Sequence, residues 1–123
     1  DRASTTTRIL LVRSLIECRN FTRAGTELKT IFGKDPANPS ARTIAAAIAL
    51  QKGDLAEAVF QMDRLMLDHP DYSDAYINMA YIYLMMDPGA NRDMAIMYYK
   101  TALDFGAKRD PRLESDLNIE VVN

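Results

Sequence analysis

Matching residues recur along this chain at a separation of 34 positions, and that period constrains the fold more than any single motif does. Pro36 and Pro70 each end a helical segment and are separated by one such period, as are Ala24 and Ala58. Apolar residues follow both alanines at the same intervals, namely Leu28 and Ile31 in the first copy and Met62 and Leu65 in the second. The chain therefore repeats one structural unit.

A third copy of the pattern contains Ala95, Tyr99 and Ala102 at the same internal spacing. Its alanine follows Ala58 by 37 positions, because the turn sequence Asp87-Pro88-Gly89 lengthens this copy by three. Three copies account for most of the 123 residues, a length that suits one domain.

Each copy is expected to form two helices. In the middle copy, Gly53 ends the first helix, and Asp54 with Glu57 forms a capping box for the second. That second helix carries an apolar stripe at helical spacing and ends at His69-Pro70. Strand signals are absent, and Asp110-Pro111 is a start signal for a short seventh helix. The expected helices span about residues 6–19, 21–32, 41–52, 55–69, 73–86 and 91–105, followed by the short helix from 110.

These units resemble the tetratricopeptide repeat (TPR), a helix–turn–helix of about 34 residues with small residues at the helix crossing and proline at its end. The third copy matches best, through Tyr76, Met79, Ala80, Tyr83, Ala95, Tyr99 and Ala102. The middle copy matches at Ala45, Ala46, Gly53, Ala58 and Pro70, but Arg42 stands in place of a large apolar residue and Ala49 in place of the inner tyrosine. The first copy keeps Ala24 and Pro36, with Val12 in the small-residue place and Asn20-Phe21 in place of the glycine turn.

The resemblance covers about residues 5 to 109 and implies an all-α fold. The implied fold is a right-handed superhelical α-solenoid of about three TPR units, at 5–38, 39–72 and 73–109. A capping helix follows at 110–123, and we expect all of residues 1–123 to form one domain. We expect Ala46, Ala58, Ala80 and Ala95 to lie where two helices cross closely. We expect Tyr76, Tyr83 and Tyr99 to fill the gaps toward neighbouring helices.

The sequence predicts neither an enzyme nor a metal or cofactor site. His69 is the only histidine and has no second His or Cys near it, so we interpret it as structural. Cys18 is the only cysteine, and we expect it to be buried or partly buried. No phosphate-binding glycine loop, catalytic serine motif or zinc-binding helix motif is present.

Charge is unevenly distributed, although the whole chain has a net charge of only −2. Residues 1–42 hold eight basic and four acidic side chains, a net charge of +4, which leaves −6 for the remainder. An RNA-binding repeat protein needs basic residues along its whole concave face, so nucleic acid is not an expected partner. Apolar runs such as Ile9 to Val12, and even the longest one, Met79 to Met86, are far too short to span a membrane, so membrane insertion is not expected either. The asymmetry can instead orient a protein partner or favour head-to-tail association.

The family resemblance also implies a binding surface, because the first helices of successive TPR units line a concave groove that holds a peptide or helix of another protein. The corresponding residues here are Ile9, Arg13, Ile16, Glu17, Thr43, Ala47, Leu50, Gln51, Ile77, Asn78, Tyr81, Leu84 and Met85. Most are apolar, which implies an apolar or amphipathic ligand segment. Tyr81 is expected to project into the groove and to offer its ring and hydroxyl to the partner. The Lys and Asn clamp that holds a carboxylate in the best-known grooves is missing.

All seven methionines lie from residue 62 onward, and Met85 and Met86 cannot both be buried on one helix face. They are interpreted as adaptable core filler, with at least one of that pair meeting solvent or a partner. The segment 9–16 has apolar residues on more than one face, so we expect one face to meet an upstream helix or another copy of the chain.

The predicted function is therefore a protein–protein interaction scaffold. The alternative is a structural segment of a longer solenoid or a self-associating module, with its groove filled by its own tail or by further repeats. Because residue 1 is Asp rather than Met, we expect a processed or excised piece. We also expect the protein to be bacterial. Its compartment is left open between the cytoplasm and export after removal of a leader.

Overall fold

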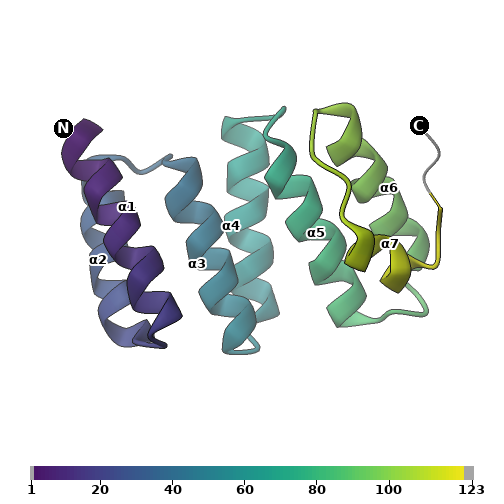
Figure 1. Cartoon of the computed structure of the whole chain (residues 1–123), viewed down its shortest axis with the longest axis horizontal. Coiled ribbons are helices and arrows are strands. Elements are labelled where there is room, and N and C mark those ends of the chain that lie inside the picture. Colours follow the sequence, from purple (N-terminus) through teal and green to yellow (C-terminus); the bar gives the residue numbers. More distant parts are fainter. Residues whose placement is uncertain (1, 121–123) are drawn as a thin grey trace. The chain divides into compact units, whose positions relative to one another are not determined.

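The chain is all-α in the part that its computed structural model describes, which is the backbone of residues 2–120 and the side chains of residues 4–120. No strand occurs within that range (Figure 1). The seven helices are α1 (Arg2–Glu17), α2 (Phe21–Lys34), α3 (Pro39–Gln51), α4 (Leu55–Asp68), α5 (Ser73–Met86), α6 (Arg92–Asp104) and α7 (Pro111–Leu117). They confirm the seven expected helices and the absence of strands.

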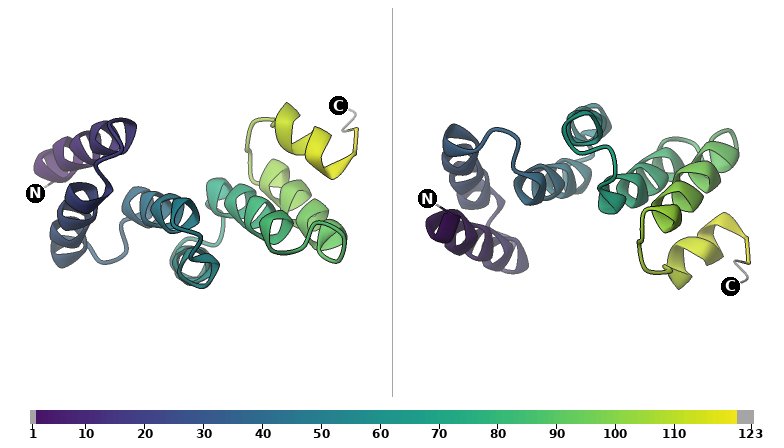
Figure 2. Two further views of the ribbon diagram at one scale, coloured as in Figure 1. Left: turned by 90° about the horizontal axis from the view of Figure 1, so that it is seen from below. Right: turned by 90° about the horizontal axis from the view of Figure 1, so that it is seen from above.

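Two compact units make up the chain, and the boundary between them follows α4 at residue 68. In the first unit α1 packs against α2 and α3 against α4, while α3 also contacts α2 and α1 (Figure 2). In the second unit α5 packs against α6, and α7 contacts α6. Each of the three helix pairs is antiparallel and closely packed, as a helix–turn–helix unit requires. The expected single domain over 1–123 stays a prediction.

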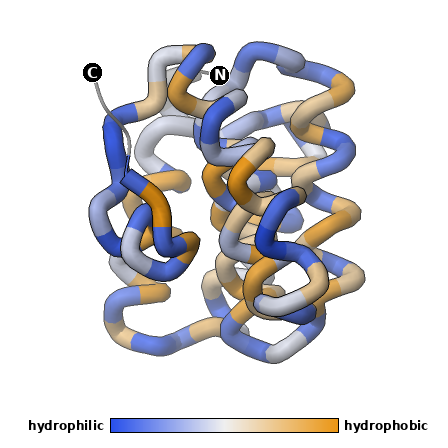
Figure 3. The backbone as a smooth tube through the Cα atoms, turned by 90° about the vertical axis from the view of Figure 1, so that its right-hand side faces the viewer, coloured by the Kyte–Doolittle hydropathy of each residue, from blue (hydrophilic) through white to orange (hydrophobic). Residues whose placement is uncertain are grey.

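Each unit has its own apolar core. The hydropathy colouring of the backbone shows hydrophobic and hydrophilic residues alternating along the helices (Figure 3). The four alanines expected at helix crossings are all buried, which confirms that they occupy tightly packed places. Core residues of the first unit include Val12, Leu15, Ala24, Leu28, Ile31, Ala41, Ile44 and Ile48. Those of the second unit include Ala80, Ala95, Tyr99, Leu113 and Leu117.

One side-chain contact recurs with the period of the sequence in the first unit. The Arg8 guanidinium donates from Nη1 to Oε2 of Glu27 at 3.1 Å. One period later, Arg42 donates from Nη1 to Oε1 of Gln61, also at 3.1 Å. Both pairs connect the first helix of a copy to the middle of the second. The sequence repeat is thus also a repeat of specific contacts.

The third copy keeps this contact with different chemistry. Tyr76 takes the place of Arg42, and its ring lies 6.3 Å from that of Tyr98, the residue that replaces Gln61 after the insertion in the turn. The phenol of Tyr76 donates to the carbonyl of Pro70, just as Arg42 donates from Nη2 to the carbonyl of Pro36 at 2.8 Å. Arg42 therefore serves as the large residue that it replaces: it packs on a neighbouring ring, 5.8 Å from the centroid of Phe32, and holds the preceding turn.

The turn between α1 and α2 is equivalent to the turn between α3 and α4, but the residue that corresponds to Gly53 is not the one expected from the sequence. Gly53 has a φ of +77°, in the left-handed region that favours glycine. The residue one period earlier, Arg19, takes a φ of +61°. The expectation that Asn20-Phe21 replaces the glycine is therefore wrong, because Arg19 occupies the glycine place. Asn20 instead caps α2 by accepting a hydrogen bond from the Arg23 amide at 3.3 Å.

Differences from the expected helix bounds are largest in α1, which covers residues 2–17 rather than 6–19. The left-handed residue at 19 ends the helix early. At the other end, packing on α2 and the Arg8–Glu27 ion pair outweigh the low helix propensity of three consecutive threonines.

Replacing Gly53 with Ala should destabilise the first unit by about 1–2 kcal/mol, because an L-residue is strained in the left-handed region. A methyl group at this place meets no neighbouring atom, so the effect is conformational rather than steric. Gly25→Ala is the matched control, since it lies inside α2 with equally open space and should stabilise by about 0.5–1 kcal/mol. Urea unfolding followed by circular dichroism measures both. Equal shifts for the two variants would contradict the turn assignment.

Candidate functional site

One face of α5 carries the third-copy residues that were expected to line a binding groove. Ile77, Tyr81, Leu84 and Met85 are spaced at i, i+4, i+7 and i+8, so they share one side of the helix. The first three are half-buried and pack against the edge of the core of the second unit. Met85 is 53% exposed. We call this surface the α5 face.

The chain after α6 returns to form a wall beside the α5 face. Gly106, at a φ of +96°, ends α6, and the following residues lead to α7, which Asp110 caps by accepting a hydrogen bond from the Leu113 amide at 3.0 Å. Leu113 and Leu117 point into the core and are fully buried. Their helical spacing leaves Arg112 and Asp116 on the outer side of α7, where both are exposed.

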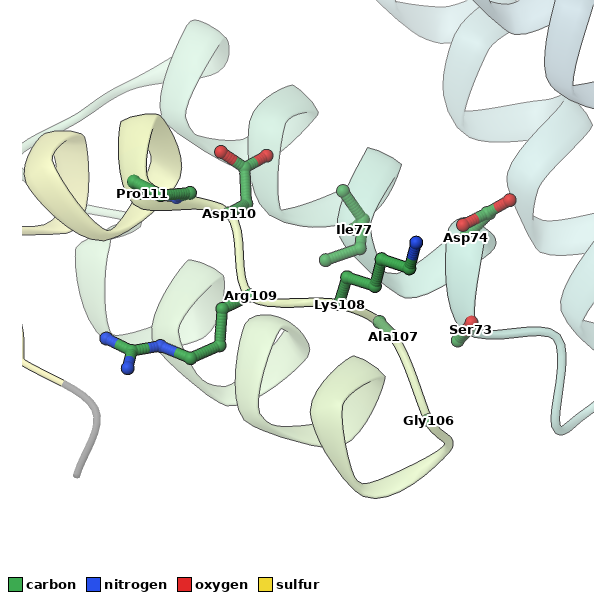
Figure 4. Close-up of a pocket in the computed structure, with 9 residues that line it drawn as sticks. All are labelled: Ser73, Asp74, Ile77, Gly106, Ala107, Lys108, Arg109, Asp110 and Pro111. Carbon is green, nitrogen blue, oxygen red and sulfur yellow. The ribbon is translucent and has the colours of Figure 1, made fainter. Parts of the chain in front are cut away.

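A cavity of about 510 Å³ lies at the amino-terminal end of the α5 face (Figure 4). Ile77 supplies its apolar side, while Lys108 and Asp74 bring one positive and one negative charge. In Figure 4 the Lys108 side chain extends toward Ile77 and Asp74, whereas Arg109 points away from them. The lining residues are Ser73, Asp74, Ile77, Gly106, Ala107, Lys108, Arg109, Asp110 and Pro111.

A second cavity, of about 530 Å³, lies at the carboxyl-terminal end of the α5 face. Tyr81, Leu84 and Met85 form its apolar floor together with Pro88. Arg112 and Asp116 of α7 line its charged side. Both cavities therefore combine apolar residues of α5 with basic and acidic side chains in their lining.

Tyr81 and Asp110 join α5 to the wall between these cavities. The Tyr81 hydroxyl donates to Oδ2 of Asp110 at 2.6 Å. Burial, the hydrogen bond to Asp110 and the negative charge of that carboxylate raise the pKa of Tyr81 to about 12. The expectation that this hydroxyl is open to a partner is therefore wrong, because the chain's own α7 cap has taken it. Tyr81 is a structural link within the site.

A buried polar network holds α7 in place. The Tyr99 hydroxyl donates to the Glu114 carboxylate and accepts a hydrogen bond from the Asp110 amide at 2.9 Å. Arg109 donates to the same carboxylate from Nη2 at 2.7 Å and from Nε at 3.1 Å. At the far end of α7, Arg92 donates from Nε to the carbonyl of Leu117 at 2.9 Å. Hydrogen bonds from Arg109 and from Tyr99 lower the pKa of Glu114 to about 2.

This network predicts an acid-sensitive attachment of α7. The pKa of Glu114 is depressed from 4.5 in the unfolded chain to about 2 in the folded one. The Glu114 carboxylate therefore contributes fully to the stability of the folded state above pH 4.5. That contribution should be lost as the pH falls from 4.5 toward 2. Thermal midpoints across this range should therefore fall more steeply for the wild type than for Glu114→Gln, while the exposed control Glu120→Gln should follow the wild type. Parallel curves for Glu114→Gln and the wild type would contradict the network.

Apart from Asn78, the other predicted groove residues belong to the first unit, on α1 and α3. Ile9 and Ile16 are half-buried against its core, and the Thr43 hydroxyl donates to the Pro39 carbonyl at 2.9 Å. Leu50 is half-buried, while Arg13, Glu17, Ala47 and Gln51 are exposed. Asn78 of α5 is half-buried. One continuous groove over the whole predicted set stays a prediction.

Neither Cys18 nor His69 lines a cavity of the α5 face. Cys18 is exposed, so the expectation of a buried or partly buried thiol is wrong: α1 ends at Glu17 and leaves Cys18 in the turn. His69 is half-buried, with its ring 6.4 Å from that of Tyr72. Within residues 2–120, no three His, Cys, Asp or Glu side chains gather in a way that could hold a metal ion.

No protein-family model matches this sequence, and no curated protein shows significant similarity to it. Among the described residues, no helix combines the length and apolar character that crossing a membrane requires.

Proposed function

We propose that this chain is a protein–protein interaction scaffold whose helix pairs form a right-handed superhelical TPR-type solenoid. The support is the periodic recurrence of contacts: the Arg8–Glu27 and Arg42–Gln61 pairs, and the bonds from Arg42 and Tyr76 to the preceding prolines. Each of these contacts joins two segments of one repeat or a repeat to the turn before it, so their recurrence indicates that the whole unit is repeated and not only single helices. α7 acts as the capping helix, since it covers α6 with Leu113 and Leu117.

The α5 face is the binding surface in this proposal, and the observation that carries it is the presence of a cavity at both of its ends. A segment lying along α5 beside α7 would bury apolar side chains over Ile77 and over Leu84 and Met85. Its charged residues would meet Lys108 and Asp74 at one end. The ligand is therefore an amphipathic peptide or helix with apolar residues along one side. Catalysis forms no part of this function.

The alternative is a structural segment with no separate ligand, and one observation favours it. The link between Tyr81 and Asp110 places part of the α5 face under the chain's own carboxyl-terminal segment. If the α5 face serves only to pack against this segment, no peptide selected from a library should bind to it. The two functions are thus separated by a direct binding experiment.

Substitution of Met85 tests the proposal with a control at the next residue. Met85 is 53% exposed and lines a cavity, whereas Met86 is 48% exposed and does not line it. Peptides selected from a random library against the wild type should bind Met85→Glu at least about tenfold more weakly, because a charge would replace an apolar contact. Met86→Glu should bind as the wild type does. Failure to select any peptide, or equal effects of the two variants, would favour the structural alternative.

A further inference from the structure

The outer side of α4 carries large apolar side chains that the first unit does not use. Phe60 is 54% exposed and Leu67 is 73% exposed, and they lie two turns apart on one side of the helix. Asp63 lies between them, and a cavity of about 400 Å³ is lined by Asp63, Met66 and Leu67. The helix is acidic, with Glu57, Asp63 and Asp68 against a single basic residue, Arg64. This surface, the α4 face, is apolar with a negative charge at its centre.

The outer side of α1 has the complementary character. Leu10 is 62% exposed, and Arg13 follows it one turn later on the same side. Arg13 and Asp63 make no ion pair within the part of the chain that the structure describes. Residues 1–42 carry a net charge of +4, so α1 lies in a basic environment. We call this surface the α1 face.

The repeat itself indicates that a helix fits on the α1 face. Leu10 corresponds to Ile44 of α3, which follows it by one repeat period. Ile44 is buried in the core formed with α2, whereas Leu10 is 62% exposed. The same position on the same kind of helix is therefore covered in α3 and uncovered in α1.

We propose that the α1 face of one copy of this chain docks on the α4 face of a second copy. Leu10 enters the cavity beside Leu67, with Phe60 packing next to it, and Arg13 pairs with Asp63. Opposite charges set the register, and apolar burial supplies most of the affinity. The two faces are on helices that do not pack against each other. The α1 face of each copy can therefore bind the α4 face of a second copy while its own α4 face binds a third, so association is head-to-tail.

Light scattering with charge-reversed variants tests the docking. The weight-average mass of the wild type should rise above that of a monomer with protein concentration, and this rise should shrink in high salt. Arg13→Asp and Asp63→Arg should each weaken association about tenfold or more, and the double variant should restore it. Phe60→Ser should weaken it similarly, whereas Met97→Ser, which removes an equally exposed residue (51%) at the same repeat position of α6, should not. A strict monomer at all concentrations would overturn the proposal.

Cysteine cross-linking identifies the contact itself. In a Cys18→Ser background, chains carrying Leu10→Cys are mixed with chains carrying Leu67→Cys under mild oxidation. A disulfide-linked heterodimer should form faster than it does when Met97→Cys replaces Leu67→Cys. All four original side chains are exposed, so the variants should fold. Equal rates for the two mixtures would overturn the α1–α4 contact, even if the chain associates in another way.

Discussion

Tyr99→Ala should destabilise the second unit by about 3–5 kcal/mol, the usual cost of removing a fully buried aromatic ring. Tyr99 is completely buried and lies in the core where α5, α6 and α7 meet. Its loss also removes the hydrogen bonds to the Glu114 carboxylate and from the Asp110 amide. We therefore expect α7 to detach from α6 and the helix α6 to lose stability.

Amide hydrogen exchange measures this effect within each unit, which a single unfolding midpoint does not. Protection should collapse in α6 and α7 of Tyr99→Ala and persist in α1 and α2. Tyr99→Phe separates the ring from its hydroxyl and should cost about 1–2 kcal/mol, because a buried amide and a carboxylate lose a partner. If Tyr99→Ala left protection in α6 unchanged, the packing of the second unit described above would be wrong.

Ala80→Leu and Ala46→Leu should each destabilise the fold by about 1–3 kcal/mol, because a larger side chain must separate the closely crossing helices. Both alanines are buried, Ala80 together with Ala95 in the core of the second unit and Ala46 on α3, which packs against α4.

Exposed alanines elsewhere in the two units provide matched controls for this experiment. Ala47, next to Ala46, and Ala90, in the turn before α6, are both exposed. Leucine at either place should change the thermal midpoint little. If Ala46→Leu and Ala80→Leu were as stable as these controls, the helices would not cross at the alanines.

The sequence predicted most of the fold because the information lies in local signals that recur. Period, capping residues and proline stops predicted all seven helices, and α5 was predicted with its bounds unchanged. Arg42 looked like a departure from the repeat, yet its long side chain reaches both the Phe32 ring and the Pro36 carbonyl. The equivalence of arginine and tyrosine at this place depends on three-dimensional reach, which spacing alone does not reveal. The left-handed backbone at Arg19 was missed for a similar reason, because arginine carries no turn signal.

The candidate site was predicted in part. Helical spacing grouped Ile77, Tyr81, Leu84 and Met85 on one face, and the structure places all four along cavities. Lys108, Arg112 and Asp116 were missed because they come from the segment that returns beside α5. The spacing of Leu113 and Leu117 was the available signal, since burying both puts Arg112 and Asp116 on the outer side of α7. The bond from Tyr81 to Asp110 joins two places far apart in the sequence, and no local pattern predicts it.

Methyl NMR of the methionines shows directly whether a partner segment lies along the α5 face. With ¹³C-methyl methionine, each of the seven methionines reports on its own surroundings: Met85 on the α5 face, Met94 and Met97 on the exposed side of α6, and Met62 and Met79 in buried places. A peptide selected against the wild type should shift the Met85 signal strongly and leave those of Met94 and Met97 in place. Shifts at Met94 and Met97 with an unchanged Met85 signal would contradict the account.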